Sequence, residues 1–195
     1  TDEAGVPLYT GLDYRFSPAS LAIRDLIRDG AIGDVRILRL VYIWTCHGKW
    51  IADESGRLVE NERRAGRMYE GGPMVDCGVH QIDLARFWLG SEVIRWKAAG
   101  GWADDYDAPD HLWLHMEHEN AAHSMVEISY SYGHTARDRP TRFTYEIIGT
   151  DGLIRYDREA KLFEVRTASE TWRLPFASEK NFAGMYSAFA EALRT

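Results

Sequence analysis

The sequence predicts an α+β domain in which helices pack on one face of an open, predominantly antiparallel sheet. Three observations lead to this prediction. Helical spacing is confined to a few separate segments, a long series of strand-like segments follows, and turn sequences such as Thr150-Asp151-Gly152 separate some of those strands. With 195 residues the chain can bury one sizeable core, whereas two domains would be cramped.

Three segments are predicted to be helices, residues 17–29, 73–90 and 181–194. Ser17 and Pro18 suit the cap and first turn of a helix, and Gly90 suits a helix end. Eight segments are predicted to be strands, namely residues 35–45, 92–101, 111–118, 122–132, 142–148, 152–157, 162–166 and 171–174. Residues 46–70 are charged and glycine-punctuated and are expected to form a long, largely loop-like connection, which is often functional.

Apolar residues alternate with polar ones along two of the predicted strands. Leu112, Leu114 and Met116 alternate with a mixed set that includes His115 and Trp113. Because successive strand residues point to opposite faces, one face of the sheet should be apolar and the other mixed. The helices should cover the apolar face. The mixed face could be solvated or could pair with a second copy of the chain, and we expect it to support a homo-oligomer.

The composition excludes several classes of partner. The net charge is −7 and the pI about 5.5, and the 23 Lys and Arg residues are scattered, which argues against nucleic acid and anionic membranes. No stretch approaches the roughly 18 apolar residues of a membrane span. Only Cys46 and Cys77 occur, and no Asn-x-Ser/Thr acceptor is present, so a reducing cytoplasm is expected. The first residues contain no start methionine and no signal peptide, so the chain is expected to be a piece of something longer.

The most informative segment is the second predicted helix, which carries three ionisable side chains on one face. At about 100° per residue, Asp76 at 0° places His80 near 40° and Asp83 near −20°. Cys77 falls about 100° away and is expected to be a buried structural thiol. Such groups on a helix this hydrophobic should line a polar cleft or form a satisfied network.

Two interpretations of this stripe follow from the residues alone. In the structural one, Asp76 and His80 form a hydrogen bond or Asp76 helps to cap the helix. In the functional one, His80 takes a proton from a substrate hydroxyl as that carbon loses a hydride, and a nearby carboxylate orients it or shifts its charge.

The same residues resemble the substrate-domain signature of the glucose-fructose oxidoreductase and inositol dehydrogenase family. The resemblance covers essentially the whole chain. Its motifs are Gly71-Gly72-Pro73 with Asp76, Gly78, His80 and Asp83-Leu84, then Tyr14-Arg15-Phe16-Ser17-Pro18, Gly30-Ala31-Ile32-Gly33-Asp34-Val35, Gly149-Thr150-Asp151-Gly152 and Phe182 to Arg194. Pro73 departs from the more usual third glycine and removes one backbone N–H, although it suits a helix start.

The resemblance implies a role for His80 as catalytic acid/base and for Asp76 as its partner or a substrate contact. It also implies a Rossmann domain that binds NAD or NADP and precedes the present one. The sequence contains neither a Gly-x-Gly-x-x-Gly loop nor the family's Glu-Lys-Pro motif with its catalytic lysine. Residues 1–14 are therefore expected to be a remnant of the last strand of the nucleotide-binding domain and of its linker, and residues 15–195 the substrate-binding and oligomerisation domain. The chain alone is expected to be inactive, with no cofactor site of its own.

The resemblance also suggests substrate contacts from Arg15, Asp83, His47, Lys49 and Trp50. A salt bridge is an equally good interpretation of Arg15, and a solvated loop is the alternative for His47, Lys49 and Trp50. No metal site is expected. His111 and His115 share a strand face and His118 points to the other.

Two functions from different classes thus remain open. The first is a polyol, sugar or cyclitol oxidoreductase that uses NAD(P) and contains this chain as its substrate domain. The second is a non-catalytic ligand-binding or assembly module.

Overall fold

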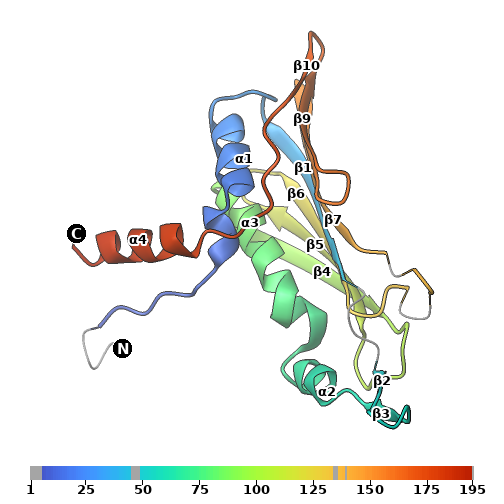
Figure 1. Cartoon of the computed structure of the whole chain (residues 1–195). Coiled ribbons are helices and arrows are strands. Elements are labelled where there is room, and N and C mark those ends of the chain that lie inside the picture. The colour runs from blue at the N-terminus through green and yellow to red at the C-terminus, as the bar shows by residue number, and fades with distance from the viewer. Residues whose placement is uncertain (1–5, 45–48, 134–135, 139, 195) are drawn as a thin grey trace.

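The computed structural model describes residues 6–44, 49–133, 136–138 and 140–194. Its centre is an eight-stranded sheet, and helices α1 (Pro18–Arg28) and α3 (Val79–Leu89) lie along one face of it (Figure 1). The predicted fold class is confirmed. Within the described parts of the chain, no helix is long and apolar enough to cross a membrane.

The sheet has the strand order β10-β9-β8-β7-β1-β6-β5-β4. Its strands are β1 (Val35–Ile43), β4 (Val93–Gly101), β5 (His111–His118), β6 (His123–Ser129), β7 (Arg142–Gly149), β8 (Gly152–Asp157), β9 (Leu162–Thr167) and β10 (Thr171–Arg173). The central strand β1 pairs in parallel with β6, and every other neighbouring pair is antiparallel. The parallel register brings the carboxyl ends of β1 and β6 to the same edge of the sheet, where Ile43 lies opposite Ser129.

The core lies between the helices and the apolar face of the sheet. Leu38 and Leu40 of β1 are fully buried there, and Leu84 of α3 and Ile23 of α1 are buried with them in one cluster. The indole of Trp88 donates to the carbonyl of Ser20 at 3.1 Å and joins α3 to α1. The alternation predicted along β5 and β6 is confirmed, because Leu114, Met116, Val126 and Ile128 are buried whereas Trp113 and Met125 are exposed.

Residues 49–70 correct the expectation of a largely loop-like connection. They form a two-stranded hairpin, β2 (Trp50–Ala52) with β3 (Leu58–Glu60), followed by α2 (Glu62–Tyr69). Asn61 caps α2, since its side chain accepts from the N–H of Arg64 at 3.3 Å. These elements are short and strongly polar, and the one buried residue of α2 is Arg64, so no apolar periodicity marked them in the sequence.

The second predicted helix is not a single regular α-helix. Its first part, η2 (Met74–Gly78), is a π-helical turn, and only from Val79 does α3 follow. Gly71 (φ 118°) and Gly72 (φ 67°) adopt backbone angles that favour glycine and lead the chain into this turn. The angles of about 100° per residue used for Asp76, Cys77 and His80 therefore do not apply across the turn.

The two ends of the described chain extend away from the sheet together. Helix α4 (Phe182–Ala192) and residues 6–12 project beyond the helix layer (Figure 1), and Tyr9 meets Phe189 with ring centroids 4.9 Å apart. Residues 6–12 form no strand, and the short 3₁₀ helix η1 (Asp13–Phe16) follows them. Large apolar side chains of these two projecting segments, such as Leu8 and Tyr186, are exposed.

Candidate active site

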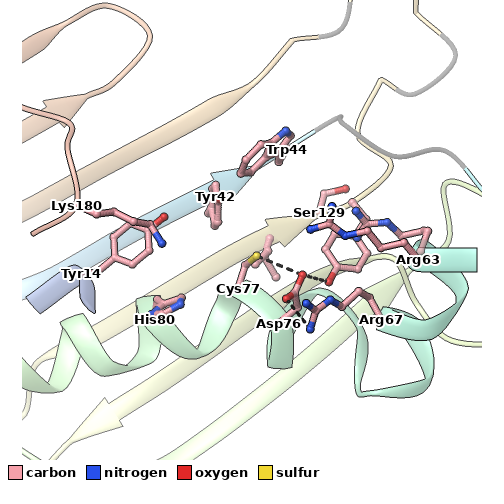
Figure 2. A pocket seen from close by; sticks show the side chains of 13 residues that line it. Tyr14, Tyr42, Trp44, Arg63, Arg67, Asp76, Cys77, His80, Ser129 and Lys180 are labelled. Carbon is pink, nitrogen blue, oxygen red and sulfur yellow. Dashed lines mark hydrogen bonds and ion pairs between the residues drawn. The ribbon is translucent and has the colours of Figure 1, made fainter. Parts of the chain in front are cut away.

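A cavity of about 270 Å³ lies where η2 and the start of α3 face the carboxyl ends of β1 and β6. Figure 2 shows the side chains that converge on it. Its lining comes from six parts of the chain and consists of Tyr14, Tyr42, Trp44, Arg63, Arg64, Arg67, Asp76, Cys77, His80, Ile128, Ser129, Tyr130 and Lys180. The volume is just below the range of about 300–1,000 Å³ typical of ligand pockets, which suits a small ligand.

His80 points into this cavity from α3. Burial lowers the pKa of its imidazole, and the nearby Lys180 lowers it further, while Asp13 acts in the opposite direction. The Oδ1 atom of Asp13 lies 4.0 Å from Nδ1 of His80, and the ring of Tyr14 lies 4.7 Å from the imidazole. The resulting neutral imidazole can accept a proton at neutral pH, and the Asp13 carboxylate is placed to stabilise the imidazolium that forms.

Lys180 completes this end of the cavity from the segment before α4. Its ammonium group lies 3.1 Å from Oδ2 of the buried Asp13 and 4.8 Å from the ring centroid of Tyr14. Lys180 therefore holds the charge of Asp13 close to His80. The carboxylate next to the imidazole is Asp13, which the sequence-based prediction had not singled out.

Asp76 lines the same cavity but has different neighbours from those expected. The hydroxyl of Tyr130 donates to its Oδ2 at 2.5 Å, and Arg67 lies 3.6 Å from its Oδ1. Burial and the Asp76 carboxylate raise the pKa of Tyr130, so the phenol stays protonated and acts as the donor. Asp76 is thus fixed toward Tyr130 and Arg67, and the role that remains proposed for it is that of a substrate contact.

Cys77, which the helical angles placed off the stripe of Asp76 and His80, also lines the cavity, and this corrects the expectation of a buried thiol. Its thiol lies 3.5 Å from Oδ2 of Asp76, and the residue lines the cavity between Asp76 and His80 (Figure 2). Asp76 and Cys77 both lie in the π-turn, a distortion of the helix that occurs often at functional sites.

Arg15 and Asp83 are joined to each other rather than to the cavity. The guanidinium donates from Nε and Nη2 to the two carboxylate oxygens at 2.7 and 2.5 Å, and Asp83 is only 4% exposed. This bidentate pair ties η1 to α3. It agrees with the salt-bridge interpretation of Arg15, and a substrate contact from either residue stays a prediction.

Of the remaining expected contacts, Lys49 and Trp50 lie at the β2–β3 hairpin. The backbone N–H of Lys49 donates to Asp104 at 2.8 Å, and its ammonium group bonds to the carbonyl of Asp105. Trp50 begins β2 and is half exposed. Neither residue lines the cavity. His47 lies outside the described residues.

One group of three potential metal ligands occurs among the described residues, on the mixed face of the sheet. Nε2 of His115 lies 3.0 Å from Nδ1 of His123, with the Glu117 carboxylate close by and paired to Arg95 at 3.3 Å. His118 points to the other face, as expected, and bonds to Ser124 at 2.8 Å. The group is remote from the cavity, and the absence of a metal from the function stays a prediction.

Several residues that line the cavity were not predicted from the sequence. Arg63, Arg64 and Arg67 of α2 carried a readable signal, because their spacing places them along one short helical stretch. Asp13 and Lys180 carried none, since they are about 170 positions apart in the chain and meet only in the fold.

The structure thus places a partly buried imidazole, that of His80, beside the carboxyl ends of two strands of an open, predominantly antiparallel sheet. Residues 20–155 match the family model described as GFO/IDH/MocA C-terminal domain. The chain therefore belongs to this family, an oxidoreductase family that includes sugar and inositol dehydrogenases, and corresponds to its C-terminal domain.

Individual relatives agree with this assignment. The chain is 29% identical over 171 residues to D-apiose dehydrogenase of Paraburkholderia graminis, covering 83% of this chain and 40% of the relative. It is 28% identical over 159 residues to scyllo-inositol 2-dehydrogenase (NAD(+)) of Bacillus subtilis, covering 78% and 40%. The chain thus spans about two fifths of the length of these relatives.

The fold is also that of a solved enzyme. Aldose-aldose oxidoreductase from Caulobacter crescentus, complexed with glycerol, superposes with a TM-score of 0.77 at 18% identity. The match covers 99% of this chain and 55% of that one.

Proposed function

We propose that this chain is the substrate-binding and oligomerisation domain of an oxidoreductase that transfers a hydride between NAD(P) and a hydroxyl carbon of a sugar, cyclitol or related polyol. The observation that carries the proposal is the partly buried imidazole of His80, whose pKa is lowered by burial and which faces a small cavity beside the Asp13–Lys180 pair. The substrate class is supported by the names of the two dehydrogenase relatives.

The proposed chemistry divides between a proton and a hydride. In the oxidation direction, the substrate hydroxyl gives its proton to the imidazole of His80, and the Asp13 carboxylate stabilises the resulting imidazolium. Asp76, held by Tyr130 and Arg67, accepts a hydrogen bond from a second substrate hydroxyl. NAD(P), when bound, supplies the hydride acceptor.

The part of the chain that the structure describes offers no complete dinucleotide site. The sequence has no Gly-x-Gly-x-x-Gly loop, and the cationic groups at the acid/base end are already engaged, since Lys180 pairs with Asp13. We therefore propose that the dinucleotide is held mainly by residues outside this chain. As an isolated polypeptide, the chain should reduce neither NAD nor NADP.

The test uses the protein that carries this chain together with a nucleotide-binding domain. His80→Ala should lower kcat for polyol oxidation by a factor of about 10² to 10⁴, the usual effect of losing a general acid or base. His118→Asn is the matched control, because His118 is a buried histidine on a strand away from the cavity. Turnover unchanged in the His80 variant would reject the proposal and favour a non-catalytic ligand-binding module.

A further inference from the structure

The cavity is divided into two ends of different chemistry. Figure 2 shows His80, Tyr14 and Lys180 at one end and Arg63, Arg67 and Asp76 at the other. Arg64 belongs to the second end, because its guanidinium lies 3.7 Å over the ring of Tyr130, whose hydroxyl bonds to Asp76. The acid/base group and the arginines thus face the same ligand from opposite sides.

The arginine end carries more positive than negative charge. Three guanidinium groups line it, and Asp76 is its one lining carboxylate. Glu70 lies beside this end and pairs with Arg67 at 2.8 Å, so even with Glu70 counted the arginines exceed the carboxylates by one. Within the described residues Arg63 forms no ion pair.

The positions of these arginines are set by the fold. Stacking on Tyr130 fixes the buried Arg64, and Asp76 and Glu70 hold Arg67. A preorganised guanidinium presents parallel N–H donors that match the two oxygens of a carboxylate or phosphate, and a neutral hydroxyl uses this arrangement poorly. The surplus charge and the donor geometry favour the same kind of ligand group.

We propose that the substrate is a polyol bearing an oxyanion, a carboxylate or phosphate, which the arginines of α2 bind while the hydroxyl to be oxidised lies at His80. This inference rests on the proposed function and narrows its substrate class. It assigns Arg63 as a specificity residue, because its charge is available to the ligand and takes no part in the acid/base end.

The experiment measures binding to the 195-residue chain by calorimetry, with neutral and charged sugars of the same stereochemistry. The probes are D-glucose, D-glucuronate and D-glucose 6-phosphate, with D-galactose and D-galacturonate as a second series and inorganic phosphate as a stereochemistry-free anion. At least one charged sugar should bind tenfold or more tightly than its neutral parent, and added salt should reduce the difference. The carboxylate and phosphate arms identify which oxyanion is preferred.

Two variants localise the effect. Arg63→Gln should weaken binding of the charged sugar by about 3- to 10-fold and leave the neutral sugar unchanged, consistent with removing one ionic contact. The matched control is Arg57→Gln in the β2–β3 hairpin, whose exposed guanidinium does not line the cavity and should affect neither ligand.

Equal or tighter binding of the neutral sugar, charged-sugar binding that Arg63→Gln leaves unchanged, or no binding of any charged sugar would each overturn the inference. Arg63-dependent binding of NADP without binding of a charged sugar would also overturn it, because the arginines would then serve the cofactor. The proposed function is tested separately: unchanged turnover of the His80→Ala variant in the complete protein would reject it. It would still stand if the preferred substrate proved to be neutral.

Discussion

At the scale of single residues, the burial of His80 couples the stability of the fold to pH. Burial lowers the pKa of His80 in the folded chain below its ordinary value of 6.5, so the unfolded chain binds the proton more readily. The contribution of neutral His80 to the free energy of unfolding is fully present above about pH 6.5. It is lost as the pH falls through the lowered pKa of the folded state. The melting temperature of the wild-type chain should therefore decrease as the pH is lowered from about 7 to about 5.

His80→Asn should flatten this pH dependence, because the variant has no imidazole to protonate at the cavity. The comparison is His118→Asn, since burial also lowers the pKa of His118, which is held by Ser124 and the carbonyl of Ser91. Thermal unfolding of the three proteins across the pH range separates the two contributions. A His80 variant with the same slope as the wild type would show that this imidazole is solvated.

A second prediction at the scale of single residues concerns the Arg15–Asp83 ion pair. Asp83→Asn removes the charge from an almost fully buried acceptor of two hydrogen bonds and should cost about 1–3 kcal/mol in the free energy of unfolding. The control is Glu92→Gln, which breaks the similarly bidentate but exposed Arg86–Glu92 pair and should have little effect. Urea unfolding measures both. If Asp83→Asn leaves stability intact but weakens sugar binding, the pair belongs to the substrate site.

At the scale of elements, regular structure was predictable and its distortion was not. Strong alternation and β-branched composition located β5 and β8 to the residue, and Ser17-Pro18 located the start of α1. The π-turn at Met74–Gly78 depends on the positive φ angles before it and on packing behind it, neither of which a residue pattern records. Asp76 and Cys77 both lie in this turn and both line the cavity.

The glycine pair before the π-turn makes this distortion testable. Gly71 has φ 118°, and a Cβ there would lie 2.5 Å from Cγ2 of Val75. Gly71→Ala should therefore cost about 1–3 kcal/mol through backbone strain and the displaced side chain of Val75. Gly66→Ala is the matched control, because a Cβ there meets nothing within 4 Å and alanine should stabilise α2 by about 0.5–1 kcal/mol. Equal stability of the two variants would contradict the strained entry into the turn.

At the scale of the whole molecule, the mixed face of the sheet has the chemistry of a self-complementary surface. A row of side chains crosses all eight strands, with two basic residues on one side of Met125 and arginines alternating with glutamates on the other: Lys97, His115, Met125, Arg39, Glu146, Arg155, Glu164 and Arg173. Arg39 lies 3.6 Å from Glu127 and 3.7 Å from Glu146, and four large apolar side chains, Ile37, Trp113, Met125 and Ile148, are between 40 and 46% exposed. Mixed charges around exposed apolar groups can pair with their own copy about a two-fold axis.

Met125 lies near the middle of this face, so it is the position at which a charge should separate the copies. Met125→Glu should convert an oligomer into the 22.3 kDa monomer, because the new carboxylate would be buried against its symmetry-related surface without a dedicated partner. The control is Leu58→Glu, which changes an equally large exposed side chain on the β2–β3 hairpin and should leave the mass unchanged. Sedimentation velocity measures the mass, and circular dichroism checks that both variants remain folded. If the wild-type chain sediments as a monomer at high protein concentration, self-association through this face is rejected. The exposed apolar side chains of the face would then serve another partner.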